Sequence, residues 1–127
     1  MAEGSDGGNL YTFVAALLAA HGMTALSLAY FGQDDLPKDL IGIPVEYFVE
    51  AVRWLGTPAV LGFSRGAEAA LLTASICPDV RAVVAMVPGT LTGGGISPSD
   101  PSAMTKSAWT LEGQPLPLLP PVWARSQ

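Results

Sequence analysis

The chain has 127 residues, half of them apolar, and carries a net charge of −5 with only six Lys and Arg. This length is typical of one small domain, and the apolar content excludes a disordered chain. The basic residues are scattered along the sequence, which argues against nucleic acid or an anionic membrane surface as a partner.

Cysteine and histidine occur once each, as Cys77 and His21. A single Cys excludes an internal disulfide and favours a reducing, intracellular compartment. Neither residue has other metal ligands at a suitable spacing, so the sequence predicts no metal site and no cofactor. We expect Cys77, which precedes Pro78 at a helix end, to be a small buried apolar side chain.

The region 7–33 contains no Asp, Glu, Lys or Arg and is long enough to suggest a membrane helix. Three features argue against that interpretation. His21 and Gly22 interrupt the apolar run, and the part after them is typical of a strand. The N-terminus carries Glu3 and Asp6 where a signal peptide would be basic. The sequence therefore predicts no membrane span.

The first half of the chain predicts a helix, a strand and a loop. Apolar residues fall at helical spacing between Asn9, a candidate N-cap, and Gly22, a candidate C-terminal cap: Leu10, Phe13, Val14, Leu17 and Leu18. The region 24–30 is a short apolar run, as expected of a parallel strand buried on both faces. The region 33–42 holds most of the local charge and predicts a loop.

The second half of the core repeats this alternation. Pro44 suits the first position of a helix whose inward stripe is Val45, Phe48, Val52 and Leu55 and whose end is Gly56. A strand at 58–63, a helix at 65–76 and a strand at 80–87 follow. We expect an α/β fold with a parallel three-stranded sheet, flanking helices and ligands at the carboxyl ends of the strands.

After Pro88 the periodic pattern ends, and clustered Gly and Pro predict loop and extended backbone. We therefore divide the chain into a core at 1–92 and a Pro- and Gly-rich extended tail at 93–127. The stretch 115–121 is either a connecting segment or a polyproline-II ligand for an aromatic groove.

The pentapeptide 62–66 reads G-x-S-x-G, with a predicted strand before it and a predicted helix after it. In that context the motif is typical of a nucleophile elbow, in which Ser64 projects from the sheet on a strained turn. The backbone N–H of Arg65 is then the first candidate oxyanion donor. The alternative is a glycine-rich turn between strand and helix, capped by Ser64.

A Ser nucleophile needs a general base oriented by an acid, and in the α/β-hydrolase fold the expected chain order is Ser, acid, His. Four acids follow Ser64: Glu68, Asp79, Asp100 and Glu112. No His follows it. We expect His21 to bind a late carbonyl of its own helix and Glu68 to be structural, at the start of the third helix. A complete triad is therefore not expected from these residues.

Several pieces of the sequence resemble the C-terminal α/β-hydrolase domain of the acyl-CoA thioesterases and bile acid-CoA:amino acid N-acyltransferases. They are LLAAHG at 17–22, AYFG at 29–32, DLPK at 35–38, IPVEYF at 43–48 and GFSRGAE at 62–68. The resemblance covers nearly the whole chain. The DLPK and IPVEYF pieces are more specific than the elbow alone.

The resemblance implies an acyl-CoA substrate and a covalent acyl-enzyme at Ser64. The acyltransferase branch has Cys at that position, so Ser64 favours the thioesterases. The family's Gly-rich loop matches the region 6–8 and implies the Gly7 N–H as second oxyanion donor. The family's Asp and His lie on later strands that these residues do not include, so we expect a fragment, a shortened product or a degenerate copy. The family occurs in cytosol, mitochondria and peroxisomes, and we expect the cytoplasm first.

Two other functions remain open. The first is a non-catalytic α/β fragment that acts as an interaction module and self-associates through unpaired sheet edges. The second is an enzyme similar to carboxylesterases or dienelactone hydrolases, which share the elbow but not the more specific pieces.

Overall fold

A computed structural model describes residues 1–118 except 3, 10 and 57–58. It contains helices α1 (Thr12–Ala20), α2 (Val45–Leu55) and α3 (Arg65–Ile76), a short 3₁₀ helix η1 (Ala103–Thr105) and strands β1 (Ile43–Pro44), β2 (Ala59–Phe63), β3 (Ala82–Met86), β4 (Trp109–Leu111) and β5 (Gln114–Pro115). The fold is mixed α/β, as the sequence predicts. Leu10, Pro58, Pro120 and Pro121, which entered the sequence predictions, lie outside the described residues.

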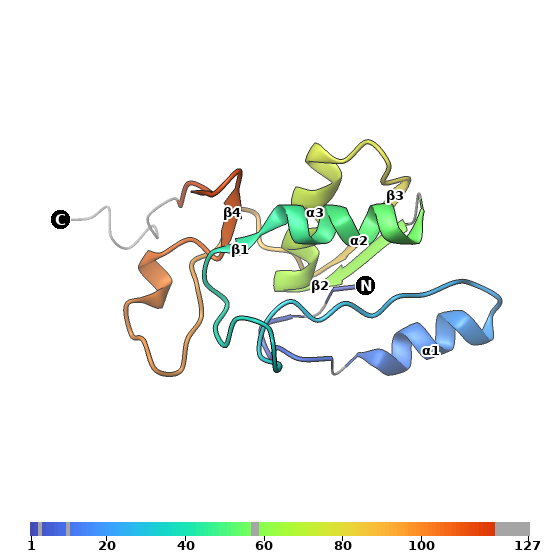
Figure 1. The fold of residues 1–127 in the computed structure, drawn as a ribbon, viewed down its shortest axis with the longest axis horizontal. Coiled ribbons are helices and arrows are strands. Elements are labelled where there is room, and N and C mark those ends of the chain that lie inside the picture. The colour runs from blue at the N-terminus through green and yellow to red at the C-terminus, as the bar shows by residue number, and fades with distance from the viewer. Residues whose placement is uncertain (3, 10, 57–58, 119–127) are drawn as a thin grey trace.

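The β2–α3–β3 unit lies beside α2 (Figure 1). Strands β2 and β3 pair in parallel, from Ala59 opposite Ala82 to Phe63 opposite Met86. Helix α3 connects them and packs on both. This unit confirms the predicted strand–helix–strand order.

The predicted parallel three-stranded sheet is not what the structure shows. The region 24–30 does not form a regular strand; it contributes one bridge, from Leu28 to Ala2. Ala2 also bridges to Gly62, so it lies between Leu28 and β2. Ala2, which extends the sheet beside β2, thus lies in a Gly-rich start with no alternation of apolar and polar residues. The periodicity of the sequence therefore could not identify it.

A second small sheet has the order β1–β4–β5. Ile43 pairs with Trp109 in parallel, and β5 folds back antiparallel on β4. The prediction of loop and extended backbone after Pro88 is therefore wrong for part of the region 103–115. These elements are two or three residues long and depend on pairing with distant residues, so no local pattern marks them. The division of the chain at residue 92 stays a prediction.

Aromatic side chains form the core between the two sheets. Trp109 is fully buried, and its ring centroid lies 5.9 Å from that of Tyr30 and 6.0 Å from that of Phe48. Phe48 comes from α2, where Val45 and Val52 are also buried, which confirms the inward stripe of this helix. Pro44 precedes the helix as its N-cap instead of occupying the first helical position. Cys77 is buried, as expected.

Helix α1 exists but does not bury the predicted stripe. Phe13 is 65% exposed and Leu17 is 57% exposed, and Ala15 is the one described helix residue that is buried. The helix contacts the rest of the fold near its start, where the Tyr11 ring lies 5.6 Å from the Phe63 ring. In Figure 1 the helix then runs along the lower edge, away from α2 and α3. No described helix is long and apolar enough to cross a membrane.

Asp100 gives a pH-dependent contribution to stability. Its carboxylate accepts a hydrogen bond from Lys106 Nζ at 2.7 Å and from the Ser102 hydroxyl and backbone N–H, and these bonds lower its pKa to about 2. A pKa that is lower in the folded state stabilises the protein above about pH 4 and loses that effect as pH falls toward 2. The stability difference between wild type and Asp100→Asn should therefore shrink over that range in urea titrations. A difference independent of pH would contradict this contribution.

Candidate functional site

Ser64 stands at the junction where β2 ends and α3 begins. Its backbone has φ 52° and ψ −113°, a conformation that is strained for a residue with a Cβ. The residue is the N-cap of α3, yet its side chain makes no capping hydrogen bond. The interpretation of Ser64 as a capping side chain therefore lacks its hydrogen bond to a backbone N–H of α3. The geometry is that of a sharp turn between a strand and a helix.

Gly62 permits this turn by close backbone approach. A Cβ placed on Gly62 would lie 2.0 Å from the carbonyl oxygen of Gly66 and 2.5 Å from the nitrogen of Ala67. These backbone atoms belong to the first turn of α3, so no side chain can yield to make room. The first Gly of the motif is thus required by the crossing of β2 and α3.

Backbone hydrogen bonds fix Ser64 between β3 and α3. Its N–H donates to the carbonyl oxygen of Met86 at 2.9 Å, and its carbonyl accepts the N–H groups of Ala67 and Glu68 at 3.0 and 3.2 Å. Val87, which follows β3, also has a positive φ of 46°. Two strained residues therefore lie at the carboxyl ends of neighbouring parallel strands, where ligands bind in α/β folds.

The positive φ of Ser64 predicts that this residue lowers the stability of the fold. Replacing Ser64 by Gly should raise the free energy of unfolding by about 1 kcal/mol, because Gly adopts positive φ without a Cβ penalty. Ser64→Ala keeps the Cβ and should leave stability nearly unchanged, which makes it the control. Urea titration of the three proteins checks this. A Gly variant less stable than the Ala variant would show that the turn is not strained.

The Gly-rich start of the chain lies against the elbow, but at Gly4. A Cβ on Gly4 would lie 3.4 Å from the Cβ of Ser64, and the Tyr30 hydroxyl donates to the Gly4 carbonyl at 3.2 Å. Gly7 has a positive φ of 69° and faces the ring of Phe31. The sequence pointed to Gly7 and not to Gly4, because the spacing of the glycines alone does not show which of them contacts Ser64.

A partly buried ion pair ties a distant loop to the first turn of α3. Glu68 is 5% exposed and receives a hydrogen bond from Arg65 Nη1 at 3.1 Å and another from the Gly93 N–H. Arg65 Nη2 donates to the carbonyl of Gly94 at 2.9 Å. A Cβ on Gly93 would overlap the Arg65 guanidinium, at 1.2 Å from Nη1. Glu68 therefore has the structural role that the sequence indicated, with a partner that the sequence did not reveal.

His21, the candidate base, and the acids Asp79 and Asp100 have partners other than Ser64. His21 is exposed at the end of α1, where its Nδ1 lies 2.8 Å from the carbonyl of Leu17, as expected of a residue at a helix end. Asp79 lies 3.9 Å from Arg53, and Asp100 pairs with Lys106. Within the described residues, no group of His, Cys, Asp and Glu is arranged to hold a metal ion.

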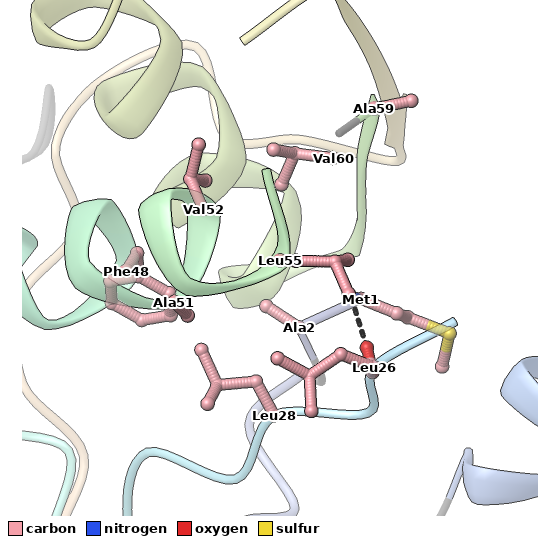
Figure 2. A pocket seen from close by; sticks show the side chains of 10 residues that line it. All are labelled: Met1, Ala2, Leu26, Leu28, Phe48, Ala51, Val52, Leu55, Ala59 and Val60. Atoms are coloured by element: carbon pink, nitrogen blue, oxygen red, sulfur yellow. Dashed lines mark hydrogen bonds between the residues drawn. The ribbon is translucent and has the colours of Figure 1, made fainter. Parts of the chain in front are cut away.

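Two cavities border this unit. One is a groove of about 450 Å³ between α3 and the region 89–92, with Glu68 among the residues that line it. The other is an apolar pocket of about 40 Å³ between α2, the start of β2 and the N-terminal residues (Figure 2). In that pocket the Met1 amino group donates to the Leu26 carbonyl, and burial lowers its pKa. Of these two cavities, the groove is the one that includes a described residue from the first turn of α3, Glu68.

The structure shows a mixed α/β chain with a strained strand–turn–helix at Ser64, and comparison with known proteins adds more specific information. No family model matches the chain. It is 43% identical over 88 residues to the peroxisomal succinyl-coenzyme A thioesterase of Mus musculus. This alignment covers 63% of this chain and 21% of that protein. It is 42% identical over 86 residues to acyl-coenzyme A thioesterase 1 of Rattus norvegicus, covering 61% and 20%.

A human relative gives the same result. Acyl-coenzyme A thioesterase 6 of Homo sapiens is 42% identical over 83 residues, covering 59% of this chain and 20% of that protein. These matches confirm the resemblance to the acyl-CoA thioesterase family. The chain spans about a fifth of the length of the curated relatives it matches.

Proposed function

We propose that Ser64 is the nucleophile of an acyl-CoA thioesterase-type serine hydrolase site, which converts acyl-CoA and water to fatty acid and CoA. The observation that carries this proposal is the strained backbone of Ser64 between β2 and α3. Support comes from relatives whose names are those of acyl-coenzyme A thioesterases. In this proposal the β2–α3–β3 unit is part of an α/β-hydrolase fold.

The proposed reaction has two steps. Ser64 Oγ attacks the thioester carbonyl carbon, the C–S bond breaks, and the proton from Oγ passes through a base to the CoA thiolate. Water then hydrolyses the acyl ester and restores the hydroxyl. As the first residue of α3, Arg65 has no intrahelical partner for its backbone N–H, which we propose as the first oxyanion donor. We propose the N–H of Gly7, in the loop that reaches Ser64 at Gly4, as the second.

The proposal includes a base from outside these 127 residues. The sequence holds one His, and that residue is engaged at the end of α1. We therefore expect the isolated chain to hydrolyse acyl-CoA at a rate close to background, because an unassisted Ser hydroxyl is a weak nucleophile.

Chemical rescue tests this function. Release of CoA from palmitoyl-CoA is measured with a thiol reagent at increasing imidazole, which is a small mobile base. Wild type should show an imidazole-dependent rate that exceeds that of Ser64→Ala. Equal rates in the two proteins at every imidazole concentration would contradict the proposal. Faster hydrolysis of simple aryl esters than of palmitoyl-CoA would favour the carboxylesterase-like alternative.

One observation favours the interaction module as a second candidate. Strand β3 pairs only with β2 among the described residues, and its Val84 and Met86 are 49% and 48% exposed. An apolar strand with a free edge promotes association. Light scattering after gel filtration tests this alternative, because self-association through the edge should disappear in Val84→Lys. A monomeric wild type would exclude it.

The cellular location is also a proposal. We propose an intracellular setting, with the cytoplasm first and mitochondria or peroxisomes as alternatives. The names of the relatives include a peroxisomal and a mitochondrial thioesterase, which supports the organelles as alternatives. Imaging of the tagged chain in cells distinguishes the three compartments.

A further inference from the structure

The groove between α3 and the region 89–92 has the size and walls of a binding site. Its volume is about 450 Å³, which falls within the usual range for small-molecule pockets. Leu71 and Leu72 of α3 line one side, Leu91 lines the other, and Pro117 adds a further apolar surface. Leu71 is 44% exposed and Leu91 is 55% exposed, so both leucines present apolar surface to solvent.

The groove begins one helical turn from Ser64. Glu68, which lines it, donates its backbone N–H to the Ser64 carbonyl at 3.2 Å. The opposite wall follows β3, whose last residue, Met86, accepts the N–H of Ser64 at 2.9 Å. Both walls are therefore attached directly to the nucleophile turn.

The side chains that line the groove disfavour binding of a phosphate group. None of the described residues that line it is basic, and the carboxylate of Glu68 is already occupied by Arg65 and the Gly93 N–H. Among the lining side chains this leaves the hydroxyls of Thr90 and Thr92 as the other polar groups. An apolar chain is thus favoured over the nucleotide part of CoA, whose phosphates would meet no positive partner.

The Arg65–Glu68 pair also holds the outer wall. It binds the Gly93 N–H and the Gly94 carbonyl, directly after the region 89–92. Resting on the proposed function, we propose that this groove takes the acyl chain of the thioester substrate and that the Arg65–Glu68 pair positions its outer wall. The small pocket in Figure 2 is not an alternative site for an acyl chain, because its volume is only about 40 Å³.

Photo-crosslinking of the folded 127-residue chain locates the bound chain. The probe is palmitic acid with a diazirine near its methyl end, so no hydrolysis is required. Trypsin separates the groove residues from the other pocket: the peptides 66–81, 82–106 and 107–125 carry Leu71, Leu72, Leu91 and Pro117 of the groove. Adducts on this first set count as groove adducts, whereas 1–38, 39–53 and 54–65 carry the pocket of Figure 2. Adducts concentrated on the first set are expected. Adducts confined to the other three peptides would overturn the proposal.

A matched pair of variants gives a second readout. Leu91 and Leu17 are 55% and 57% exposed, but Leu17 lies on α1. In titrations with a fluorescent fatty acid, Leu91→Asp should weaken binding about tenfold, because a carboxylate would be buried under the chain. Leu17→Asp should change it by less than about twofold. Equal effects of the two substitutions would overturn the proposal, and circular dichroism shows whether both variants are folded.

This test is independent of the reactivity of Ser64. Groove adducts in a protein whose Ser64 never reacts would support the groove and contradict the nucleophile. A reactive Ser64 without groove adducts would contradict the groove and leave the proposed reaction standing. Glu68→Ala tests the wall: it should weaken fatty acid binding while circular dichroism shows the secondary structure intact, and Glu68→Gln, which keeps an acceptor for the Gly93 N–H, should weaken it less. Unchanged binding in Glu68→Ala would contradict the positioning role.

Discussion

Gly62→Ala is expected to destabilise the protein by about 3 kcal/mol or more, a large effect for a single methyl group. The added Cβ would lie 2.0 Å from the Gly66 oxygen and 2.3 Å from its carbonyl carbon. Both atoms belong to the backbone of α3, so relief requires β2 and α3 to separate. Urea denaturation, followed by circular dichroism, measures the loss.

Gly22→Ala and Gly56→Ala are the controls. Both glycines have positive φ, of 83° and 79°, but an added Cβ would meet nothing within 4 Å at either position. Their cost is that of backbone conformation alone, about 1–2 kcal/mol. If Gly62→Ala were no more destabilising than these variants, the close crossing of β2 and α3 would be contradicted.

Glu68→Ala is the second large effect, with an expected loss of about 2–3 kcal/mol. The change leaves the Gly93 N–H without its acceptor and the Arg65 guanidinium without its anion. Breaking a fully buried ion pair costs about 3–5 kcal/mol, but the Arg65 side chain is 23% exposed, so solvent reduces the penalty. Glu68→Gln keeps an acceptor for Gly93 and should lose less.

The surface pair of Lys106 and Asp100 provides the comparison. Its side chains are 52% and 32% exposed, so solvent screens the pair and Lys106→Ala should cost clearly less stability than Glu68→Ala. Hydrogen exchange at the Gly93 amide gives a local readout, since exchange should accelerate in Glu68→Ala and not in Lys106→Ala. If both variants lost the same stability, Glu68 would not hold the loop.

Local patterns predicted the parts of the fold that depend on local sequence. The bounds of α3 agree with the prediction, and α2 begins one residue later than predicted, after Pro44. The core of the strands predicted at 58–63 and 80–87 is found in β2 and β3. Ser64 could be placed at the strand–helix junction because Gly62 is required by contacts only four and five residues away. The helix-end bond of His21 also follows from positions within one helix.

The remaining features depend on contacts between distant residues. Ala2 lies between Leu28 and Gly62, and Trp109 pairs with Ile43, although neither pairing has a sequence signal. The contacts of Gly4 with Ser64 and of Gly93 with Arg65 join residues that are far apart in the chain. The exposed stripe of α1 shows the converse: helical spacing predicted the helix but not what would cover its apolar face.

Labelling with a fluorophosphonate probe is the most direct test of the central claim. That claim is that the fold positions Ser64 as a nucleophile and that the general base is not among these 127 residues. The adduct is mapped by peptide mass spectrometry in wild type and Ser64→Ala, with and without imidazole. Imidazole-dependent labelling at Ser64 in the folded protein, lost in urea and in Ser64→Ala, is the predicted result. No labelling at Ser64 of the folded chain at any imidazole concentration would contradict the nucleophile, and strong labelling without imidazole would contradict the missing base.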